Sequence, residues 1–309
     1  FSETTTASFS ADFAIGAVDG GSATNDDAVM AGYGFQIDLN TSFTGEDSFD
    51  VSLDAGNAGV AGISELDLNS ASETLTVDGI SYTFPVGGAT VLVGDTVDGS
   101  SLFTTACAYG GPSNTLDDCG NVNAAFVGSG TTLATSYDFD NGFTAALGYS
   151  GDGATTNGLM TELGSDSYGA NVAYTADTYG VSVTYAMVED AAGLDDTYTA
   201  VNGYWTPEGF PSISVGYEWG DDGSAAATAD ELISYFVGIE TGFGPGTVGA
   251  ALGTKTPTVE NTTELLMYEA FYSYPINDGM SVTPLVYVKE GATGSNDETG
   301  VMVKTSFSF

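Results

Sequence analysis

Histidine and arginine are absent from this chain of 309 residues, and lysine occurs only three times. The lack of histidine excludes Ser-His-Asp and Cys-His triads as well as imidazole metal sites. Three basic residues against 42 acidic ones give a formal net charge of −39, so the chain has no positive surface for nucleic acid or phosphate groups. Carboxylate pairs are common by chance among 42 acidic residues, so they carry no weight as evidence for a glycosidase site. We expect a protein that is not an enzyme and does not bind nucleic acid.

Long apolar runs are also missing, since no stretch approaches the roughly 18 uninterrupted apolar residues of a transmembrane helix. The sequence starts at Phe1, without a basic segment before an apolar core, which predicts a mature or truncated form. Its acidity does not predict disorder, because 42% of the residues are apolar and 12% are aromatic.

The two cysteines, Cys107 and Cys119, flank a short segment rich in turn-forming residues. One cysteine pair without histidine cannot complete a zinc site, so we expect no metal there. A disulfide that closes this loop in an oxidising compartment is favoured over two free thiols.

Alternation of large apolar residues with small or polar ones is the dominant pattern. Over 179–187, for example, tyrosine, valine and methionine alternate with glycine, serine, threonine and alanine. Such a segment is a strand with one apolar and one polar face. The sixteen predicted strands cover 4–15, 29–41, 48–56, 79–86, 89–96, 131–139, 142–150, 166–176, 178–188, 196–206, 211–220, 231–241, 245–254, 263–274, 279–290 and 297–309.

The connections alternate between tight turns and long acidic loops. With an even number of strands of about 10 residues, this alternation predicts an all-β fold, a sixteen-stranded antiparallel transmembrane β-barrel. In such a barrel we expect the short turns on the periplasmic side, the long loops on the extracellular side and both termini in the periplasm. Residues 1–309 are expected to form this single domain. A soluble β-sandwich or β-solenoid is the alternative, but a sandwich core needs Leu, Ile and Val where this chain mixes aromatic with small residues. Residues 75–80 suggest a small extra hairpin.

The last strand ends on Phe309 and resembles the terminal strand of outer-membrane barrels, where a final aromatic residue serves as the assembly signal. Further segments resemble the barrel domain of cyanobacterial major outer-membrane porins: 1–2, 4–6, 39–47, 53–57, 82–87, 202–207, 212–218 and 276–284. That family is related to the carbohydrate-selective porins and is often labelled iron-uptake porin. Its members carry basic residues near the third strand, where this chain has Asp50 and Asp54.

The resemblance implies a homotrimeric channel in the outer membrane of a Gram-negative-type bacterium, a cyanobacterium, in contact with outer-membrane lipid. It also implies attachment to peptidoglycan through an N-terminal surface-layer-homology domain that is not in this sequence.

Strand register predicts which charged residues face the lumen. The expected pore-lining residues are Asp12, Asp38, Asp50, Asp54, Asp138, Glu218, Glu240, Glu269 and Lys304, while the register of Lys289 stays open. A narrow aqueous lumen between low-dielectric walls focuses their field, and rings of acids favour cations. We expect a cation-preferring diffusion channel for small solutes and inorganic ions, with carbohydrate or iron as cargo by resemblance alone.

Residues 97–130 form a long loop after the fifth strand, the position from which trimeric porins fold a constriction loop into the barrel. Leu102, Phe103, Tyr109 and Leu116 favour infolding, whereas a loop on the outer surface is the alternative. An infolded loop places four carboxylates near the constriction: Asp95, Asp98, Asp117 and Asp118.

Acidic pairs in other loops, at 26–27, 189–190, 195–196 and 221–222, are more typical of a solvated surface than of divalent-cation sites, since none has EF-hand spacing. We expect no cofactor. Two alternatives to a diffusion channel stay open: a structural outer-membrane protein with an occluded lumen, and a secreted acidic β-protein or adhesin.

Overall fold

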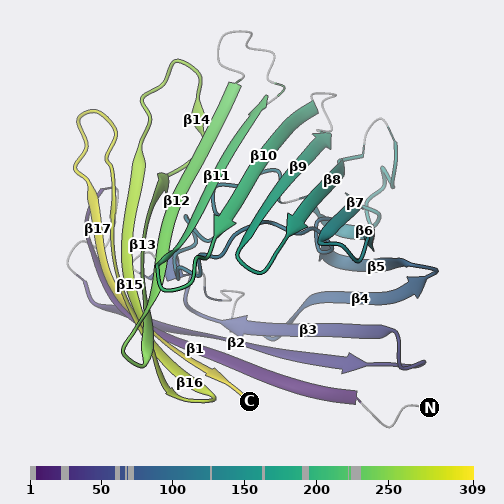
Figure 1. The fold of residues 1–309 in the computed structure, drawn as a ribbon, viewed down its shortest axis with the longest axis horizontal. Coiled ribbons are helices and arrows are strands. Elements are labelled where there is room, and N and C mark those ends of the chain that lie inside the picture. The colour runs from purple at the N-terminus through teal and green to yellow at the C-terminus, as the bar shows by residue number, and fades with distance from the viewer. Residues whose placement is uncertain are drawn as a thin grey trace.

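The computed structural model describes residues 5–21, 28–59, 63–66, 68, 73–125, 127–161, 164–189, 195–221, 223 and 231–309. Sixteen long strands in this described part form one sheet (Figure 1). They are β1 (Thr5–Gly20), β2 (Met30–Thr41), β3 (Ser48–Gly56), β4 (Thr76–Val86), β5 (Ala89–Asp98), β6 (Ser129–Asp138), β7 (Phe143–Gly151), β8 (Asp166–Thr175), β9 (Tyr179–Glu189), β10 (Asp195–Trp205), β11 (Ser212–Asp221), β12 (Glu231–Phe243), β13 (Gly246–Thr254), β15 (Leu266–Asn277), β16 (Met280–Lys289) and β17 (Glu298–Ser308). A two-residue strand, β14 (Thr258–Val259), adds to β12, and one 3₁₀ turn, η1 (Ser64–Leu66), lies between β3 and β4.

The sheet closes on itself. Each long strand is antiparallel to the next, and β17 pairs with β1 from Ser10↔Ser308 to Gly20↔Glu298. Closure leaves no free sheet edge, which removes the usual route to edge-to-edge aggregation. The predicted all-β, sixteen-stranded antiparallel barrel is therefore confirmed.

The two ends of the barrel differ. The short-turn end carries the connections 42–47, 87–88, 139–142, 176–178, 206–211, 244–245 and 278–279, and the other end is called the long-loop end. Thr5, the first described residue, and Phe309 lie at the short-turn end, where Phe9 and Phe309 exchange backbone hydrogen bonds of 2.8 and 3.0 Å.

The predicted strands lie close to the observed ones in the sequence, but two predictions about them need correction. The expected hairpin at 75–80 is wrong, because β4 runs without a break from Thr76 and shifts register against β3 near Gly79. Strand β1 continues to Gly20, beyond its predicted end at 15, because its second half pairs with β17 along the closing seam.

The outer face of the barrel is apolar. Phe13, Leu147 and Val301 are 55%, 60% and 56% exposed, and each alternates with an inward residue. Ring contacts gather near the two ends: Phe43–Tyr82, Tyr137–Phe139, Phe143–Tyr174 and Phe243–Tyr272 at the short-turn end, Tyr149–Tyr168 and Tyr217–Trp219 near the long-loop end. An apolar band between two aromatic girdles is the surface of a barrel in lipid.

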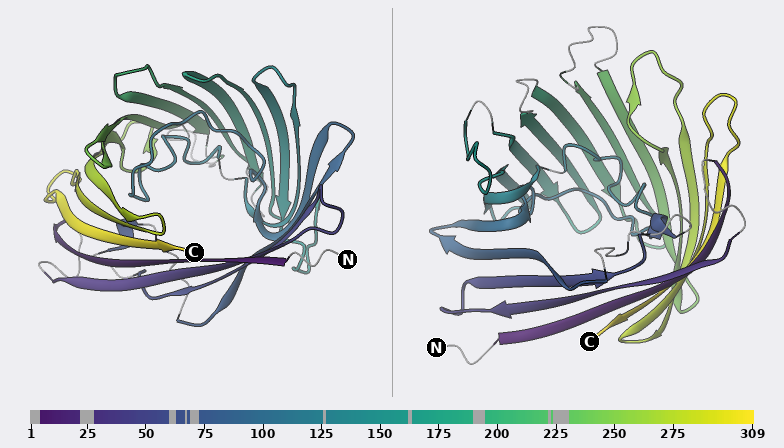
Figure 2. Two further views of the ribbon diagram at one scale, coloured as in Figure 1. Left: turned by 60° about the horizontal axis from the view of Figure 1, so that its bottom comes forward. Right: turned by 180° about the vertical axis from the view of Figure 1, so that it is seen from behind.

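The described residues contain no helix that is both long enough and apolar enough to cross a membrane. Inside the barrel, small and polar residues such as Asn171, Ser182 and Ser214 line part of the wall. Chain segments from two long loops lie in the interior (Figure 2).

Candidate functional site in the barrel lumen

The third long loop, residues 99–128, here called the lumen loop, enters the barrel through a narrow neck. Gly99 donates a backbone hydrogen bond of 3.0 Å to the Gly128 carbonyl. The Asp98 carboxylate accepts from the backbone amides of Ser100 and Val127 at 3.0 and 3.2 Å. Asp98 thus ties together the points where the chain enters and leaves.

The first half of the lumen loop crosses the inner wall in regular steps. The backbone amides of Thr104, Ala106, Ala108 and Gly110 donate to Asn171, Ser182, Ser214 and Glu240 at 3.0, 2.9, 2.9 and 2.9 Å. Those acceptors point inward from β8, β9, β11 and β12. An extended segment presents every second amide to the same side, so four strands hold the loop against the wall.

Tyr109 and Glu269 continue this attachment to β15. The Tyr109 hydroxyl donates to Oε1 of Glu269 at 2.6 Å, and both side chains are buried. Burial first, and the charge of Glu269 second, raise the pKa of Tyr109 above its ordinary value, so the phenol keeps its proton and remains the donor.

The second half of the lumen loop returns along β10 and β11. Asn202 donates its side-chain amide to the Cys119 carbonyl at 2.9 Å. Glu218 accepts from the backbone amides of Asn123 and Ala124, both at 2.8 Å. A Cβ atom at Gly216 would collide with the same Cys119 carbonyl, so this wall position needs glycine to admit the loop.

The disulfide between Cys107 and Cys119 joins the outgoing and returning halves of the lumen loop, with 6.4 Å between the Cα atoms. The predicted pairing is confirmed. The cross-link holds the loop flat against β10–β12, where both halves bond to the wall.

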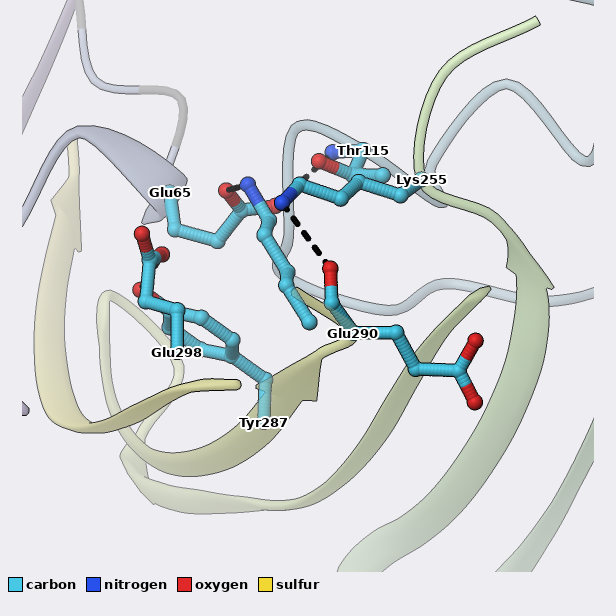
Figure 3. A network of polar contacts seen from close by, with 7 residues as sticks. Glu65, Thr115, Lys255, Tyr287, Glu290 and Glu298 are labelled. Carbon is cyan, nitrogen blue, oxygen red and sulfur yellow. Dashed lines mark hydrogen bonds and ion pairs between the residues drawn. The ribbon is translucent and has the colours of Figure 1, made fainter. Parts of the chain in front are cut away.

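A second segment, residues 63–66 with the turn η1, also enters the barrel, which the sequence analysis did not anticipate. Glu65 accepts the backbone amide of Thr115 at 3.0 Å and forms an ion pair with Lys289 (Figure 3). Its backbone carbonyl accepts the amide of Asn114 at 2.9 Å. Glu65 therefore links η1, the lumen loop and β16.

Apolar contacts stabilise this side of the lumen. Ile63 and Leu66 are fully buried in a cluster that includes Leu116 of the lumen loop and Leu285 and Met302 of the wall. This explains why β16 is apolar on both faces: one faces outward, and the other packs under the loops. It also settles the register of Lys289, which points inward.

The opposite wall, β1–β4, is acidic. Its inward residues Asp12, Asp38 and Asp50 are half-buried, and Asp54 is 6% exposed. Small polar side chains orient these carboxylates: Gln36 and Ser52 donate to Asp38, and Thr76 donates to Asp54, each at 2.7 Å. Asp78 of β4, which the sequence analysis missed, is close enough to feel the charges of Asp54 and Asp38.

Three further residues predicted to line the pore lie at different places on the inner wall. Lys304 points inward from β17, paired in register with Ala14 and Thr283. Asp138 is on the inward face at the short-turn end, where it accepts the Asp140 backbone amide at 2.8 Å. Glu240 is half-buried and holds Gly110.

Glu218 and Glu269 require a correction. Both point inward, but they are only 2% and 4% exposed because the lumen loop covers them. They anchor the loop and do not line the pore. The sequence pattern gives the face of a strand residue, but not what will cover that face.

The four carboxylates predicted at the constriction do not all lie there. Asp117 and Asp118 are exposed on the lumen loop, and Asp98 closes its neck. The placement of Asp95 at the constriction is wrong: it pairs with outward-facing Ile80 and accepts the Thr131 hydroxyl at 2.8 Å on the outer face. Regular alternation places it on that face, since Val93 also points outward and is 40% exposed.

Within the described ranges, no group of three or more Asp, Glu, Cys or His side chains is placed to hold a metal ion. Of the acidic loop pairs, 26–27 and residues 190 and 222 lie outside the described residues. Glu189 and Asp195 face each other across β9 and β10.

Solved bacterial porins share this fold. An anion-selective porin from Comamonas acidovorans aligns with a TM-score of 0.72 and 15% identity, covering 99% of each chain. OprB of Pseudomonas putida aligns with a TM-score of 0.70 and 11% identity, over 99% of this chain and 94% of that one. A mutant of the porin from Rh. blastica has a TM-score of 0.64 and 16% identity, over 99% and 100%. No family model matches the chain, and no curated protein matches its sequence.

Proposed function

We propose that this protein is an outer-membrane diffusion porin that passes small solutes and inorganic ions and prefers cations. The observation that carries the proposal is the lumen itself: a closed barrel in which one loop is pinned to β8–β15, opposite an acidic wall on β1–β4. Such a loop narrows the channel without needing to close it. The apolar outer band and the aromatic girdles support insertion in a bilayer.

Charge supports the cation preference. Asp12, Asp38, Asp50, Asp54 and Asp78 lie on one wall, and Asp117 and Asp118 are exposed on the lumen loop. Lys289 is paired with Glu65, and Lys255 donates to the Glu290 carbonyl at 3.1 Å (Figure 3). The third lysine, Lys304, is on the inward face of β17. The anion-selective porin from Comamonas acidovorans has the same fold, so selectivity follows from lumen charge and not from the barrel.

The finer features rest on the family resemblance. We propose a homotrimer in the outer membrane of a Gram-negative-type bacterium, a cyanobacterium, with peptidoglycan attachment through a further N-terminal domain. Carbohydrate and iron are proposed cargo on the same ground, and none of these features enters the charge argument.

One observation favours a second candidate, a structural outer-membrane protein with an occluded lumen. Ile63, Leu66, Leu116 and Leu285 bury apolar surface inside the barrel, as a plug would. Planar-bilayer conductance separates the two. Discrete steps in KCl support the porin, and a folded, inserted protein without steps supports the occluded barrel.

A further inference from the structure

The fourth long loop folds back over the outer face of the barrel. Leu147 points outward from β7 and is 60% exposed, whereas Tyr149, the next outward residue, is only 8% exposed. The loop residue Leu159 explains this difference. A Cβ atom built on Gly151 would lie 2.9 Å from Leu159 Cδ2 and 2.5 Å from the Tyr149 hydroxyl. The described part of the loop, residues 152–161, therefore covers the long-loop end of β7 and β8.

Asp166, the first residue of β8, is fully buried at this place. Its Oδ1 atom accepts the Tyr149 hydroxyl at 2.5 Å. Its Oδ2 atom is also buried, but has no hydrogen-bond partner among the described residues. An ionised carboxylate that loses its hydration without gaining a partner is unfavourable, so a cation beside Oδ2 would stabilise the fold.

Two more carboxylates belong to the same row of the sheet. Ser167 pairs with Val188, so the same register sets Asp166 opposite Glu189 of β9. Glu189 in turn pairs with Asp195 of β10. Glu189 is close enough to feel the charges of both aspartates, and like charges opposite one another destabilise a sheet. The row therefore increases the need for a cation.

The side chains of the protein do not supply that cation. The sequence contains no arginine and no histidine. Lys289 and Lys304 point into the lumen, and Lys255 donates to the Glu290 carbonyl. A cation at Asp166 must therefore come from solution.

The fourth long loop places further oxygen atoms beside Asp166. A Cβ atom built on Gly164 would lie 2.7 Å from the Gly158 carbonyl oxygen, 3.2 Å from the Thr161 hydroxyl and 3.4 Å from Asp166 Oδ2. These three oxygens surround one small space, which glycine leaves open. The Thr161 hydroxyl donates to the Asn157 carbonyl at 2.8 Å, so its own oxygen can still coordinate a cation.

We propose that Asp166, Glu189 and the loop oxygens bind one Ca²⁺ ion, which fastens the fourth long loop to the outer wall. Carboxylate, carbonyl and hydroxyl oxygens are ligands that Ca²⁺ prefers, and its flexible coordination suits ligands from a loop and from two strands. Asp166 and Glu189 supply the negative charge, Gly158 and Thr161 supply neutral oxygens, and water completes the shell. The site uses two carboxylates, so it does not require the group of three acidic side chains that the described residues lack.

Hydrogen–deuterium exchange of the barrel in detergent tests the site. The protein is treated with a chelator and measured with and without Ca²⁺ at an ionic strength of about 0.15 M, where salt screens the acidic surface. Calorimetric titration gives the Kd. At a Ca²⁺ concentration of about ten times Kd, the amides of residues 152–161 should exchange about tenfold more slowly, because the ion lowers the population of the open loop by that factor.

Asp166→Asn keeps an oxygen for the Tyr149 hydroxyl but removes the charge, so the exchange of its loop should no longer respond to Ca²⁺. Glu189→Gln is the second variant and should need about fivefold more Ca²⁺ for the same effect, since affinity follows ligand charge. Heat-modifiable mobility on gels verifies that each variant is folded.

The matched control is Glu264→Gln. Glu264 also accepts a tyrosine hydroxyl, from Tyr235 at 2.6 Å, but it is exposed and far along the sheet from β8. This variant should respond to Ca²⁺ as the wild type does. Exchange in the wild type that does not change with Ca²⁺ overturns the proposal. So does equal slowing in Asp166→Asn, which would show only general binding to an acidic surface. The site lies outside the lumen, so neither result depends on whether the barrel conducts.

Discussion

Asn123 and Glu218, 95 residues apart in the sequence, fasten the returning half of the lumen loop to β11. The Asn123 side-chain amide donates to Oε1 of Glu218 at 2.7 Å, and its backbone amide donates to Oε2 at 2.8 Å. With the Ala124 amide at 2.8 Å, three donors meet one buried carboxylate. Hydrogen bonds to a charged group are worth about 1.5–3 kcal/mol each, so this contact is a principal anchor of the loop.

Removal of that anchor should loosen the constriction while the barrel stays folded. Glu218→Ala is expected to raise single-channel conductance and current noise, because the returning half of the loop loses three bonds at once. Planar-bilayer recording measures both. Glu260→Gln, an exposed acid at the long-loop end, is the matched control and should behave as wild type. If Glu218→Ala had the single-channel conductance and current noise of the wild type, the anchoring role would be contradicted.

The disulfide should have a related but smaller effect. In Cys107→Ser/Cys119→Ser, each half of the loop keeps its own wall contacts, at Ser182 and Ser214 on one side and Asn202 on the other. We expect more current noise with little change in mean conductance. Reduction of the wild-type protein with dithiothreitol should reproduce the phenotype, and a large rise in mean conductance would show that the disulfide, not the wall contacts, holds the loop.

A double-mutant cycle can measure the interaction between the side chains of Glu65 and Lys289. Removal of one partner leaves a buried charge without its counterion, which costs about 3–5 kcal/mol. Glu65→Gln and Lys289→Met should each accelerate thermal denaturation in detergent. Glu65→Gln/Lys289→Met should recover part of the loss, since it leaves no unpaired charge. If the effect of the double variant on denaturation equals the sum of the two single effects, the two residues act independently.

Asp47 stabilises the turn between β2 and β3. Its carboxylate accepts the Tyr82 hydroxyl at 2.6 Å and the Thr44 backbone amide at 2.8 Å. These bonds, with that to Tyr82 the largest, hold the pKa of Asp47 well below its ordinary value of 3.8. A lowered folded-state pKa contributes stability that is fully present above the ordinary value and is lost as the pH falls below it.

Asp47→Asn should therefore denature faster than the wild type at pH 7, and the difference should shrink as the pH is lowered below about 4. Rates of heat denaturation in detergent between pH 7 and pH 3 measure this. Glu46→Gln, an exposed neighbour, controls for loss of charge in the same turn. A difference that is constant across this range would contradict the role of the ionised carboxylate.

Much of the barrel could be predicted from the sequence because alternation has a period of two and a lipid-facing wall enforces it. Large residues face outward and small ones inward over 179–187, as expected, and the inward placement of Asp12 and Asp38 follows directly. The prediction fails at Asp95, which regular alternation after outward-facing Val93 places on the outer face. The alternation from Val93 therefore already indicated the outer face for Asp95.

The lumen contents were harder to predict. Glu218, Glu269 and Asp38 look alike in sequence, since each is an acid on the polar face of a strand. Only the path of the lumen loop buries two of them as anchors and leaves the third accessible. The glycine at Gly216 was a usable signal, because a strand position without Cβ often marks a close backbone approach.

The acidic wall should control selectivity through the sum of its charges. Single replacements of Asp38, Asp50 or Asp78 by Asn should each lower the cation preference slightly, and the triple variant should lower it more, because the field is shared. The reversal potential of the triple variant should move toward zero. Asp95→Asn, outside the lumen, is the control. A shift as large for Asp95→Asn as for the triple variant would place the selectivity elsewhere.

The reversal potential of the wild-type channel under a KCl gradient is a direct measure of the proposed cation preference. At ionic strength near 0.15 M the Debye length is about 8 Å, so wall carboxylates still act on an ion in a narrow lumen. A cation-preferring lumen gives a potential whose sign shows K⁺ as the main carrier and whose size falls as salt is raised. A current carried mainly by chloride, or a preference that does not change with salt, would contradict it.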